Sequence, residues 1–126
     1  MFIGREEELK FLEDRYNSAD GQLVVLYGRR RVGKTELLRQ FCQDKEHIFY
    51  TCTEIIDEKQ LEAFSQRLLE KNHQAAKYIT RFSDWEQALL SISELAKEKK
   101  IVVVIDEFPY MVKGNNAIPS ILQKLW

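Results

Sequence analysis

The sequence alternates between segments with apolar residues three or four positions apart and short runs of consecutive apolar residues. Spacing of three or four places apolar side chains on one face of a helix. Residues 6–19 show this pattern through Leu9, Leu12, Tyr16 and Ala19. The same reasoning predicts helices over residues 34–42, over 57–72, from the capping box Ser83-Asp84-Trp85-Glu86 to about Lys99, and over 117–126.

Three short apolar runs are the predicted strands, and they cover residues 22–27, 47–52 and 101–105. The first and third runs do not alternate between apolar and polar residues, so we expect these strands to be buried on both faces. Strands that alternate with helices are typical of a parallel sheet joined by right-handed crossovers. The predicted fold class is therefore α/β.

Composition limits the classes of function. A length of 126 residues fits one domain, and 44% hydrophobic residues suffice for a folded core. The net charge of -1 gives no overall attraction to nucleic acid. The longest aliphatic run, residues 101–105, is far shorter than the roughly 20 residues of a membrane span, so we expect no membrane contact. Residues 1–6 show no secretory signal and the two cysteines form no disulfide framework, which predicts a cytoplasmic location.

The clearest chemical signal lies between the first predicted strand and the helix that follows it. Residues 28–35, Gly28-Arg29-Arg30-Arg31-Val32-Gly33-Lys34-Thr35, match the phosphate-binding pattern G-x-x-x-x-G-K-[ST]. In such a loop, glycines permit a tight turn, and backbone N–H groups surround a phosphate at the positive end of the helix. Lys34 would bridge the β- and γ-phosphates, and the Thr35 hydroxyl would ligate Mg²⁺. The alternative is a strand-to-helix turn without a ligand, which requires neither of these two side chains.

An acidic pair, Asp106-Glu107, follows the third predicted strand, at the edge where α/β sheets bind ligands. Asp106 would hold Mg²⁺ through a water molecule, and Glu107 would polarise the water that attacks the γ-phosphate. A glutamate in this position favours hydrolysis over phosphoryl transfer to a small molecule. The chain contains no N-K-x-D motif for the recognition of guanine, so ATP is the predicted nucleotide.

Four blocks of sequence resemble the archaeal ATPase family, which belongs among the AAA+-related and signal-transducing (STAND) P-loop ATPases. These blocks are residues 2–9, 27–35, 105–110, and 118–123 with Trp126, the second and third being the Walker A and Walker B motifs. The resemblance implies a P-loop NTPase fold, a three-layer α/β/α arrangement with a parallel sheet, with ATP or ADP and Mg²⁺ as cofactors. It also implies that Ile3 and Arg5 lie against the adenine, although Gly4-Arg5-Glu6 could instead simply begin a helix.

The resemblance further implies that residues 1–126 are the N-terminal part of one ATPase domain, truncated before the strand that carries a sensor residue. In this family the sheet order is 5-1-4-3-2, so a strand beyond this chain would lie between residues 22–27 and 101–105. We therefore expect the chain either to close the gap between these strands or to self-associate through their edges. A DNA or protein partner would bind through regions outside this chain.

Two functions fit these motifs. The first is Mg-dependent ATP hydrolysis, and the alternative is a nucleotide-gated interaction module that binds ATP or ADP with little turnover. The side chains of Arg29, Arg30 and Arg31 are predicted to face solvent or a partner, because the loop binds phosphate through its backbone. Residues 108–111 are predicted to form an apolar loop that packs in the core or senses a partner. Cys52 is predicted to be a small buried residue at a strand end rather than a metal ligand.

Overall fold

A computed structural model of the chain describes residues 6–18, 23–28 and 34–125. The predictions for Ile3, Arg5 and residues 29–33 lie outside the described residues. The elements follow one another as α1 (Glu6–Ser18), β1 (Leu23–Gly28), α2 (Lys34–Cys42), β2 (His47–Thr51), α3 (Asp57–Lys71), α4 (His73–Ala76), α5 (Trp85–Leu95), β3 (Ile101–Asp106), α6 (Phe108–Gly114) and α7 (Ile118–Leu125).

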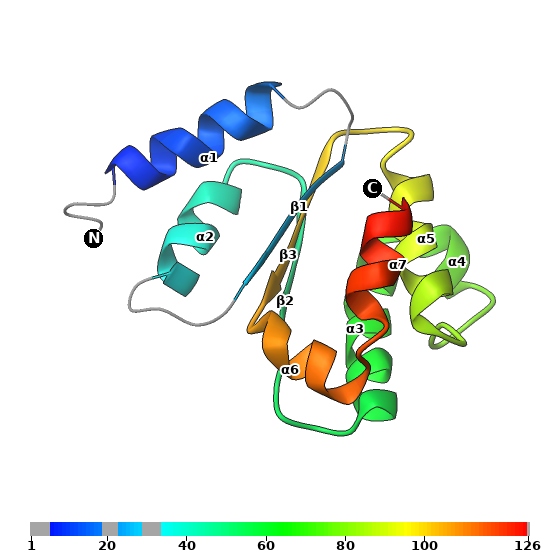
Figure 1. Ribbon diagram of the computed structural model, residues 1–126. Coiled ribbons are helices and arrows are strands. Elements are labelled where there is room, and N and C mark those ends of the chain that lie inside the picture. The colour runs from blue at the N-terminus through cyan, green and yellow to red at the C-terminus, as the bar shows by residue number, and fades with distance from the viewer. Residues whose placement is uncertain (1–5, 19–22, 29–33, 126) are drawn as a thin grey trace.

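The three described strands form one parallel sheet in the order β1-β3-β2, and helices cover both of its faces. Helices α1 and α2 lie on one side of the sheet, whereas α3, α5 and α7 lie on the other (Figure 1). The predicted α/β class and the parallel direction of the strands are confirmed. None of the helices in the described part of the chain combines the length and the apolar character that a membrane span requires.

The central strand β3 is buried along its whole length because a helical layer covers each of its faces. Ile101, Val103 and Ile105 pack into the core beneath α3, α5 and α7, whereas Val102 and Val104 pack against α2. Successive side chains of a strand point to opposite faces of the sheet, so a strand between two layers requires apolar residues at every position. The prediction that residues 101–105 are buried on both faces is confirmed.

The larger core lies between the sheet and helices α3, α5 and α7. Phe64 stands at its centre, with its ring centroid 5.3 Å from that of Tyr50 and 5.3 Å from that of Trp85. Helical spacing predicts eight inward residues on α3 and α5, and seven of them are buried: Leu61, Phe64, Leu68, Trp85, Ala88, Leu89 and Ile92. The eighth, Leu95, is half-buried and packs against this core. Full burial of side chains of this size contributes about 1.5–3 kcal/mol each, so this core dominates the stability of the fold.

Helix α1 packs on α2 through a smaller core, and two lysines strengthen this contact. Tyr16 of α1 meets Phe41 of α2 edge-on, with ring centroids 6.1 Å apart. Lys45 lies 4.3 Å from the centroid of the Phe41 ring and forms an ion pair with Glu13 of α1. Lys100 lies 4.2 Å from the centroid of the Tyr16 ring and donates a hydrogen bond to the Tyr16 carbonyl oxygen. The Lys45 contacts hold α1 against α2, the helix that follows the predicted phosphate-binding loop, and the Lys100 contacts hold α1 against the start of β3.

Strand β1 pairs directly with β3, from Leu23 opposite Ile101 to Gly28 opposite Asp106. The family resemblance implies a further strand between these two, and we expected the chain to close the gap or to self-associate. The structure shows the first outcome, since the pairing runs over the full length of both strands. Direct pairing satisfies backbone groups that an open gap would leave buried without partners.

Helix α5 differs from its prediction at both ends. Asp84, not Ser83, is the N-cap, and its carboxylate accepts a hydrogen bond from the Gln87 N–H at 2.8 Å. The helix ends at Leu95 rather than near Lys99. The chain beyond it continues in tighter turns, whose hydrogen bonds join residues three apart rather than four.

Residues 108–114 form the short helix α6, where we predicted an apolar loop. Met111 is buried and contributes to the larger core. Of the two predicted alternatives, packing in the core or sensing a partner, Met111 therefore takes the first. Tyr110 stays at the surface. Pro109 in the first turn and Gly114 at the end are boundary signals typical of a helix, and they were available in the sequence.

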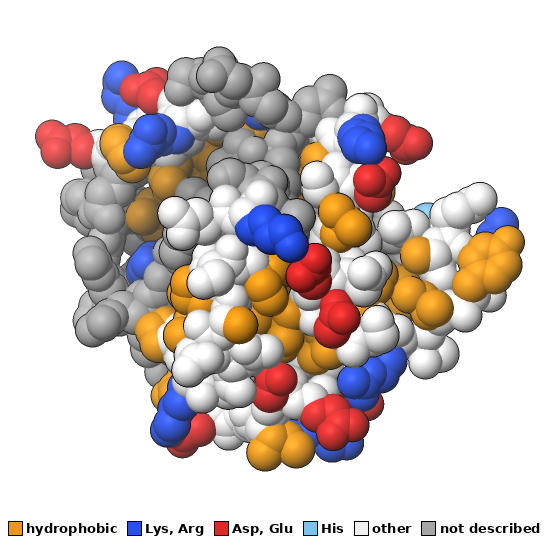
Figure 2. Space-filling model, turned by 45° about the vertical axis from the view of Figure 1, so that its right-hand side comes forward, with side chains coloured by type: hydrophobic (Ala, Val, Ile, Leu, Met, Phe, Trp, Pro, Cys, Tyr) orange, Lys and Arg blue, Asp and Glu red, His pale blue; other side chains and the backbone are white. Residues whose placement is uncertain are grey.

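Lysine and arginine side chains are mixed with aspartate and glutamate on the surface that Figure 2 shows. Ion pairs join separate elements on the α3, α5 and α7 side of the molecule, such as Arg81 with Glu58 and Glu62, and Lys124 with Glu86. Such a surface agrees with the small net charge and offers no broad field of one sign.

Candidate functional site

The two sequence motifs meet at one edge of the sheet. Strand β1 ends at Gly28 and strand β3 ends at Asp106, and these two residues are paired in the register of the sheet. Because the strands are parallel and adjacent, the segments that follow them begin side by side. This edge is the place where open α/β sheets bind ligands.

Helix α2 begins at this edge and carries the last two residues of the predicted loop. Lys34 and Thr35 form its first turn, and both are half-buried. The first turn of a helix has N–H groups without intrahelical partners and a partial positive charge, which favours a bound anion. The helix is nine residues long and amphipathic, with Leu37, Leu38 and Phe41 among its buried residues.

Thr35 and Asp106 are in direct contact, although 71 positions separate them in the sequence. The Thr35 hydroxyl donates a hydrogen bond to Oδ2 of Asp106 over 2.7 Å. The second carboxylate oxygen, Oδ1, accepts a hydrogen bond from the Glu107 N–H at 3.1 Å. Asp106 is only 2% exposed, so these two bonds compensate for the loss of water around its carboxylate.

The donor set of this pair suits a hard cation. A threonine hydroxyl and an aspartate carboxylate are oxygen ligands of the kind that Mg²⁺ prefers, and Mg²⁺ usually keeps water and takes phosphate oxygens for its remaining positions. Thr35 and Asp106 are already adjacent and held by hydrogen bonds. The residues present therefore fit a magnesium ion.

Glu107 has an unusual backbone conformation directly after the central strand. Its φ of 59° and ψ of 39° place it in the left-handed region. In the part of the chain that the structure describes, no other non-glycine residue has a positive φ. This conformation costs a non-glycine residue roughly 1–2 kcal/mol, and such strain is concentrated at functional sites. Glu107 is half-buried and immediately precedes α6.

The end of β2 supports the same site, which sequence reasoning did not anticipate. Thr51 lies opposite Asp106 in the register, and the Cys52 N–H donates a hydrogen bond to the Asp106 carbonyl oxygen over 2.8 Å. Local periodicity contains no information on the register between strands from distant segments. The sequence therefore does not predict the contact between Cys52 and Asp106; the polar Thr51 at the end of β2 is the only hint of it.

The Cys52 thiol remains protonated at this site. Burial raises its pKa to about 12, a backbone hydrogen bond at Met111 lowers it, and the nearby charges of Asp106 and Glu107 raise it further. A thiol is a nucleophile or a metal ligand only as the thiolate, so this arrangement disfavours both roles. The prediction that Cys52 is a small buried residue at a strand end is confirmed.

The structure thus brings together part of the predicted site. Gly28, Thr35, Asp106 and Glu107 gather at the ends of β1 and β3 and the start of α2. Lys34 stands in the same first turn as Thr35. The other predicted ligand-binding residues lie outside the described residues: Ile3, Arg5, Arg29, Arg30, Arg31, Val32 and Gly33.

A family model for an ATPase domain found predominantly in Archaea matches residues 2–126. The chain belongs to this archaeal ATPase family. The match covers the glycine-rich loop of the archaeal ATPase domain, its acidic pair and the N-terminal block, so the resemblance noted in the sequence is confirmed.

Two relatives come from Methanocaldococcus jannaschii. An uncharacterized protein is 34% identical to this archaeal ATPase chain over 125 residues, which is 99% of this chain and 26% of the relative. An uncharacterized ATP-binding protein is 52% identical over 46 residues, which is 36% of this chain and 78% of the relative. The chain thus spans about a quarter of the length of the first relative. No solved structure matches it.

Proposed function

We propose that this domain binds ATP and hydrolyses it with the help of Mg²⁺. The observation that carries the proposal is the 2.7 Å hydrogen bond between Thr35 and Asp106. It joins a residue of the glycine-rich loop motif to a residue of the acidic motif. Membership of an ATPase family and the similarity to a relative described as ATP-binding support the same conclusion.

Binding would depend on the loop and on the first turn of α2. Backbone N–H groups of residues 28–33 would surround the β-phosphate, and the positive end of α2 would favour its negative charge. The Lys34 ammonium would contact the β- and γ-phosphate oxygens as a compact positive charge. Ile3 and Arg5 would lie on the adenine side of the nucleotide.

Thr35 would ligate Mg²⁺ through its hydroxyl oxygen, and the Asp106 carboxylate would hold the ion through a water molecule. When bound, the ion neutralises charge on the phosphates and favours departure of the leaving group. The protein contributes the positions of these two residues, since the Asp106 carboxylate is already fixed by hydrogen bonds to both of its oxygens. A preorganised carboxylate loses little freedom when its ligand arrives.

Glu107 would act as the general base. Its carboxylate would accept a proton from the attacking water as the water oxygen bonds to the γ-phosphorus. The bond from that phosphorus to the β,γ-bridging oxygen would break, and ADP and inorganic phosphate would leave. The backbone conformation of Glu107 directly after β3 supports this role, because the main chain turns sharply at the edge of the candidate site.

Calorimetric titration of the chain with Mg-ATP and Mg-ADP tests the binding step. Lys34→Ala should abolish saturable binding, because it removes the charge that faces the phosphates. Lys97→Ala is the matched control, since Lys97 is exposed on the surface and, among the described residues, forms its ion pair with Glu94, three positions away. Equal binding by the parent chain and Lys34→Ala would contradict the assignment of the loop.

Glu107→Gln tests the hydrolytic step separately from binding. The amide cannot accept the proton, so turnover should fall by about 10²–10⁴-fold while the affinity for ATP is retained. Single-turnover measurement of phosphate release provides the comparison. Unchanged turnover in this variant would disprove the role of Glu107 as base. Tight nucleotide binding with equally negligible turnover in both proteins would favour the nucleotide-gated interaction module.

A further inference from the structure

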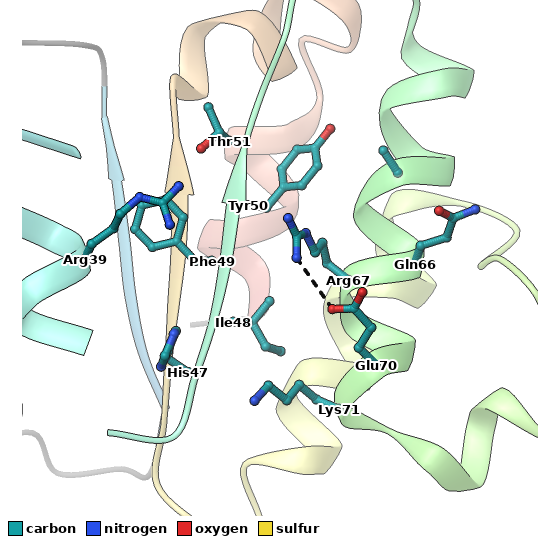
Figure 3. Close-up of a pocket in the computed structure, with 11 residues that line it drawn as sticks. Arg39, His47, Ile48, Phe49, Tyr50, Thr51, Gln66, Arg67, Glu70 and Lys71 are labelled. Atoms are coloured by element: carbon teal, nitrogen blue, oxygen red, sulfur yellow. Dashed lines mark ion pairs between the residues drawn. The ribbon is translucent and has the colours of Figure 1, made fainter. Parts of the chain in front are cut away.

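A groove of about 850 Å³ runs along the outer edge of strand β2. One wall is formed by Arg39 of α2, and the other by α3, including Arg67, Glu70 and Lys71. Figure 3 shows Arg39 on one side of the strand and the α3 side chains on the other. We call this surface the β2-edge groove. In the described sheet, β2 pairs with β3 on one side only, so the groove lies where a further strand would add.

The backbone of β2 is oriented to accept such a strand. The Glu46 carbonyl oxygen accepts a hydrogen bond from β3, and the Cys52 N–H donates one to β3, so even-numbered residues direct their backbone groups inward. Backbone groups of successive residues in a strand point in opposite directions. The N–H and C=O groups of His47, Phe49 and Thr51 therefore point outward, into the groove. An edge of this kind is a template for strand addition.

The charge of the β2-edge groove differs from that of the surrounding surface. Arg39, Arg67 and Lys71 line it with three positive charges, against two carboxylates: Glu70 in the lining and Glu46, which lies 3.8 Å from Lys71. Arg67 lies 3.6 Å from Glu70, and the Arg39 guanidinium lies 4.5 Å from the centroid of the Phe49 ring. The chain as a whole has a net charge of -1, so this local excess of positive charge is a property of the groove.

We propose that the β2-edge groove binds an extended acidic segment of a partner protein as a further strand of the sheet. The outward N–H and C=O groups require alternating acceptors and donors, which another polypeptide backbone supplies. Nucleic acid phosphates supply acceptors only and would leave the carbonyl oxygens of β2 without partners. A second copy of this chain is disfavoured because edge-to-edge pairing of two β2 strands would bring two positively charged grooves together.

Fluorescence anisotropy with a labelled peptide tests the proposal. The probe is a heptapeptide in which glutamate and valine alternate, and the control peptide has lysine in place of each glutamate. The acidic peptide should bind saturably to the 126-residue chain, and the basic peptide should not. Two further acidic peptides carry N-methyl groups on one or the other alternate set of backbone nitrogens. Only one of the two sets should abolish binding, because only one row of N–H groups faces β2.

Charge variants locate the site. Arg67→Gln should weaken binding of the acidic peptide by up to about fivefold, the range expected for one exposed charge pair. The matched control is Lys97→Gln, which removes one positive charge at the end of α5 and should leave the affinity unchanged. Circular dichroism would verify that both variants are folded.

Four results would overturn the proposal. The first is the absence of saturable binding of the acidic peptide. The second is equal binding of both N-methylated peptides, which would indicate attraction of charge without strand addition. The third is tighter binding of single-stranded oligothymidylate than of the acidic peptide. The fourth is a stable dimer in sedimentation velocity that the acidic peptide does not dissociate, since a second copy would then occupy the edge.

Discussion

Asp106 connects all the parts of the candidate site. Its side chain accepts hydrogen bonds from the Thr35 hydroxyl and the Glu107 N–H, and its carbonyl oxygen accepts one from the Cys52 N–H. These groups come from α2, from the residue after β3 and from the end of β2. A buried carboxylate without such partners would be strongly destabilising. The same bonds that permit its burial also set its orientation before any ligand arrives.

Glu107 combines a strained backbone with the side chain that we propose as the base, and the two can be separated by substitution. The free energy of unfolding of Glu107→Gly should be about 1 kcal/mol higher than that of Glu107→Ala, because glycine adopts the left-handed conformation without strain. Both variants should lack hydrolysis, since neither carries a carboxylate. Urea denaturation followed by circular dichroism measures the difference.

The order of the two stabilities is the decisive comparison. An alanine variant as stable as the glycine variant would show that residue 107 is not held at positive φ in solution. Glu107→Gln serves as the control for the lost charge, since it keeps the side-chain length and the backbone strain. Its unfolding free energy should lie closer to that of the alanine variant.

At the scale of elements, a buried glutamine holds the end of β2 against the start of α3. Gln60 is 1% exposed, and its Oε1 accepts hydrogen bonds from the Tyr50 hydroxyl and the Thr53 N–H. Its Nε2 donates to the Thr53 carbonyl oxygen over 2.8 Å. This network determines the path of the chain where β2 leaves the sheet, beside the Cys52 contact to Asp106.

Gln60→Ala should lower the free energy of unfolding by about 2–3 kcal/mol, because the buried Tyr50 hydroxyl loses its acceptor and the Thr53 backbone loses two bonds. Tyr50→Phe removes only the hydroxyl and should cost about 1 kcal/mol. In the double variant, the loss of the hydroxyl should add little, since its partner is already absent. Strictly additive effects of the two substitutions in urea denaturation would show that the two side chains are not coupled.

At the scale of the whole molecule, the sequence predicts the elements better than their arrangement. The strand at residues 101–105 and the helices α2 and α3 follow from apolar runs and spacing, because burial between layers imposes those patterns. Thr35 and Asp106 follow from motifs, which assign both to one Mg²⁺ and so predict that they lie close together. The direct pairing of β1 with β3 at Gly28 and Asp106 does not follow, because pairing between distant strands leaves no local pattern.

The short helix α6 shows a second limit. Its apolar content suggested a loop that packs in the core or senses a partner, and only its boundary residues, Pro109 and Gly114, indicated a helix. A helix of seven residues is too short for apolar spacing to be distinctive. Tertiary burial of Met111 against the larger core stabilises it instead.

The buried thiols and one buried phenol make the stability of the whole molecule sensitive to alkaline pH. Burial raises the pKa of Cys42 to about 11, although the charge of Lys45 lowers it. Burial likewise raises the pKa of Tyr50 to about 12, with Cys52 raising it further and Arg67 lowering it. Cys52 behaves similarly, with a pKa of about 12. In the unfolded chain, both thiols lose their protons near their ordinary pKa of about 8.5.

Above about pH 9 the unfolded chain therefore binds fewer protons than the folded chain, and the free energy of unfolding must fall as pH rises. Each thiol contributes a slope of up to about 1.4 kcal/mol per pH unit until the folded pKa is reached.

The variant Cys42→Ala with Cys52→Ala should be less stable than the parent chain at pH 8, because both side chains are buried, but its stability should fall less steeply toward pH 10. Urea denaturation at several pH values under anaerobic reducing conditions measures both curves. With a pKa of about 12, the folded Tyr50 keeps its proton up to pH 10, so the difference between the curves isolates the thiols. Curves that stay parallel from pH 8 to pH 10 would show that the thiols are accessible to water in the folded molecule, and that the helical layers on either side of the sheet are packed less closely than this structure indicates.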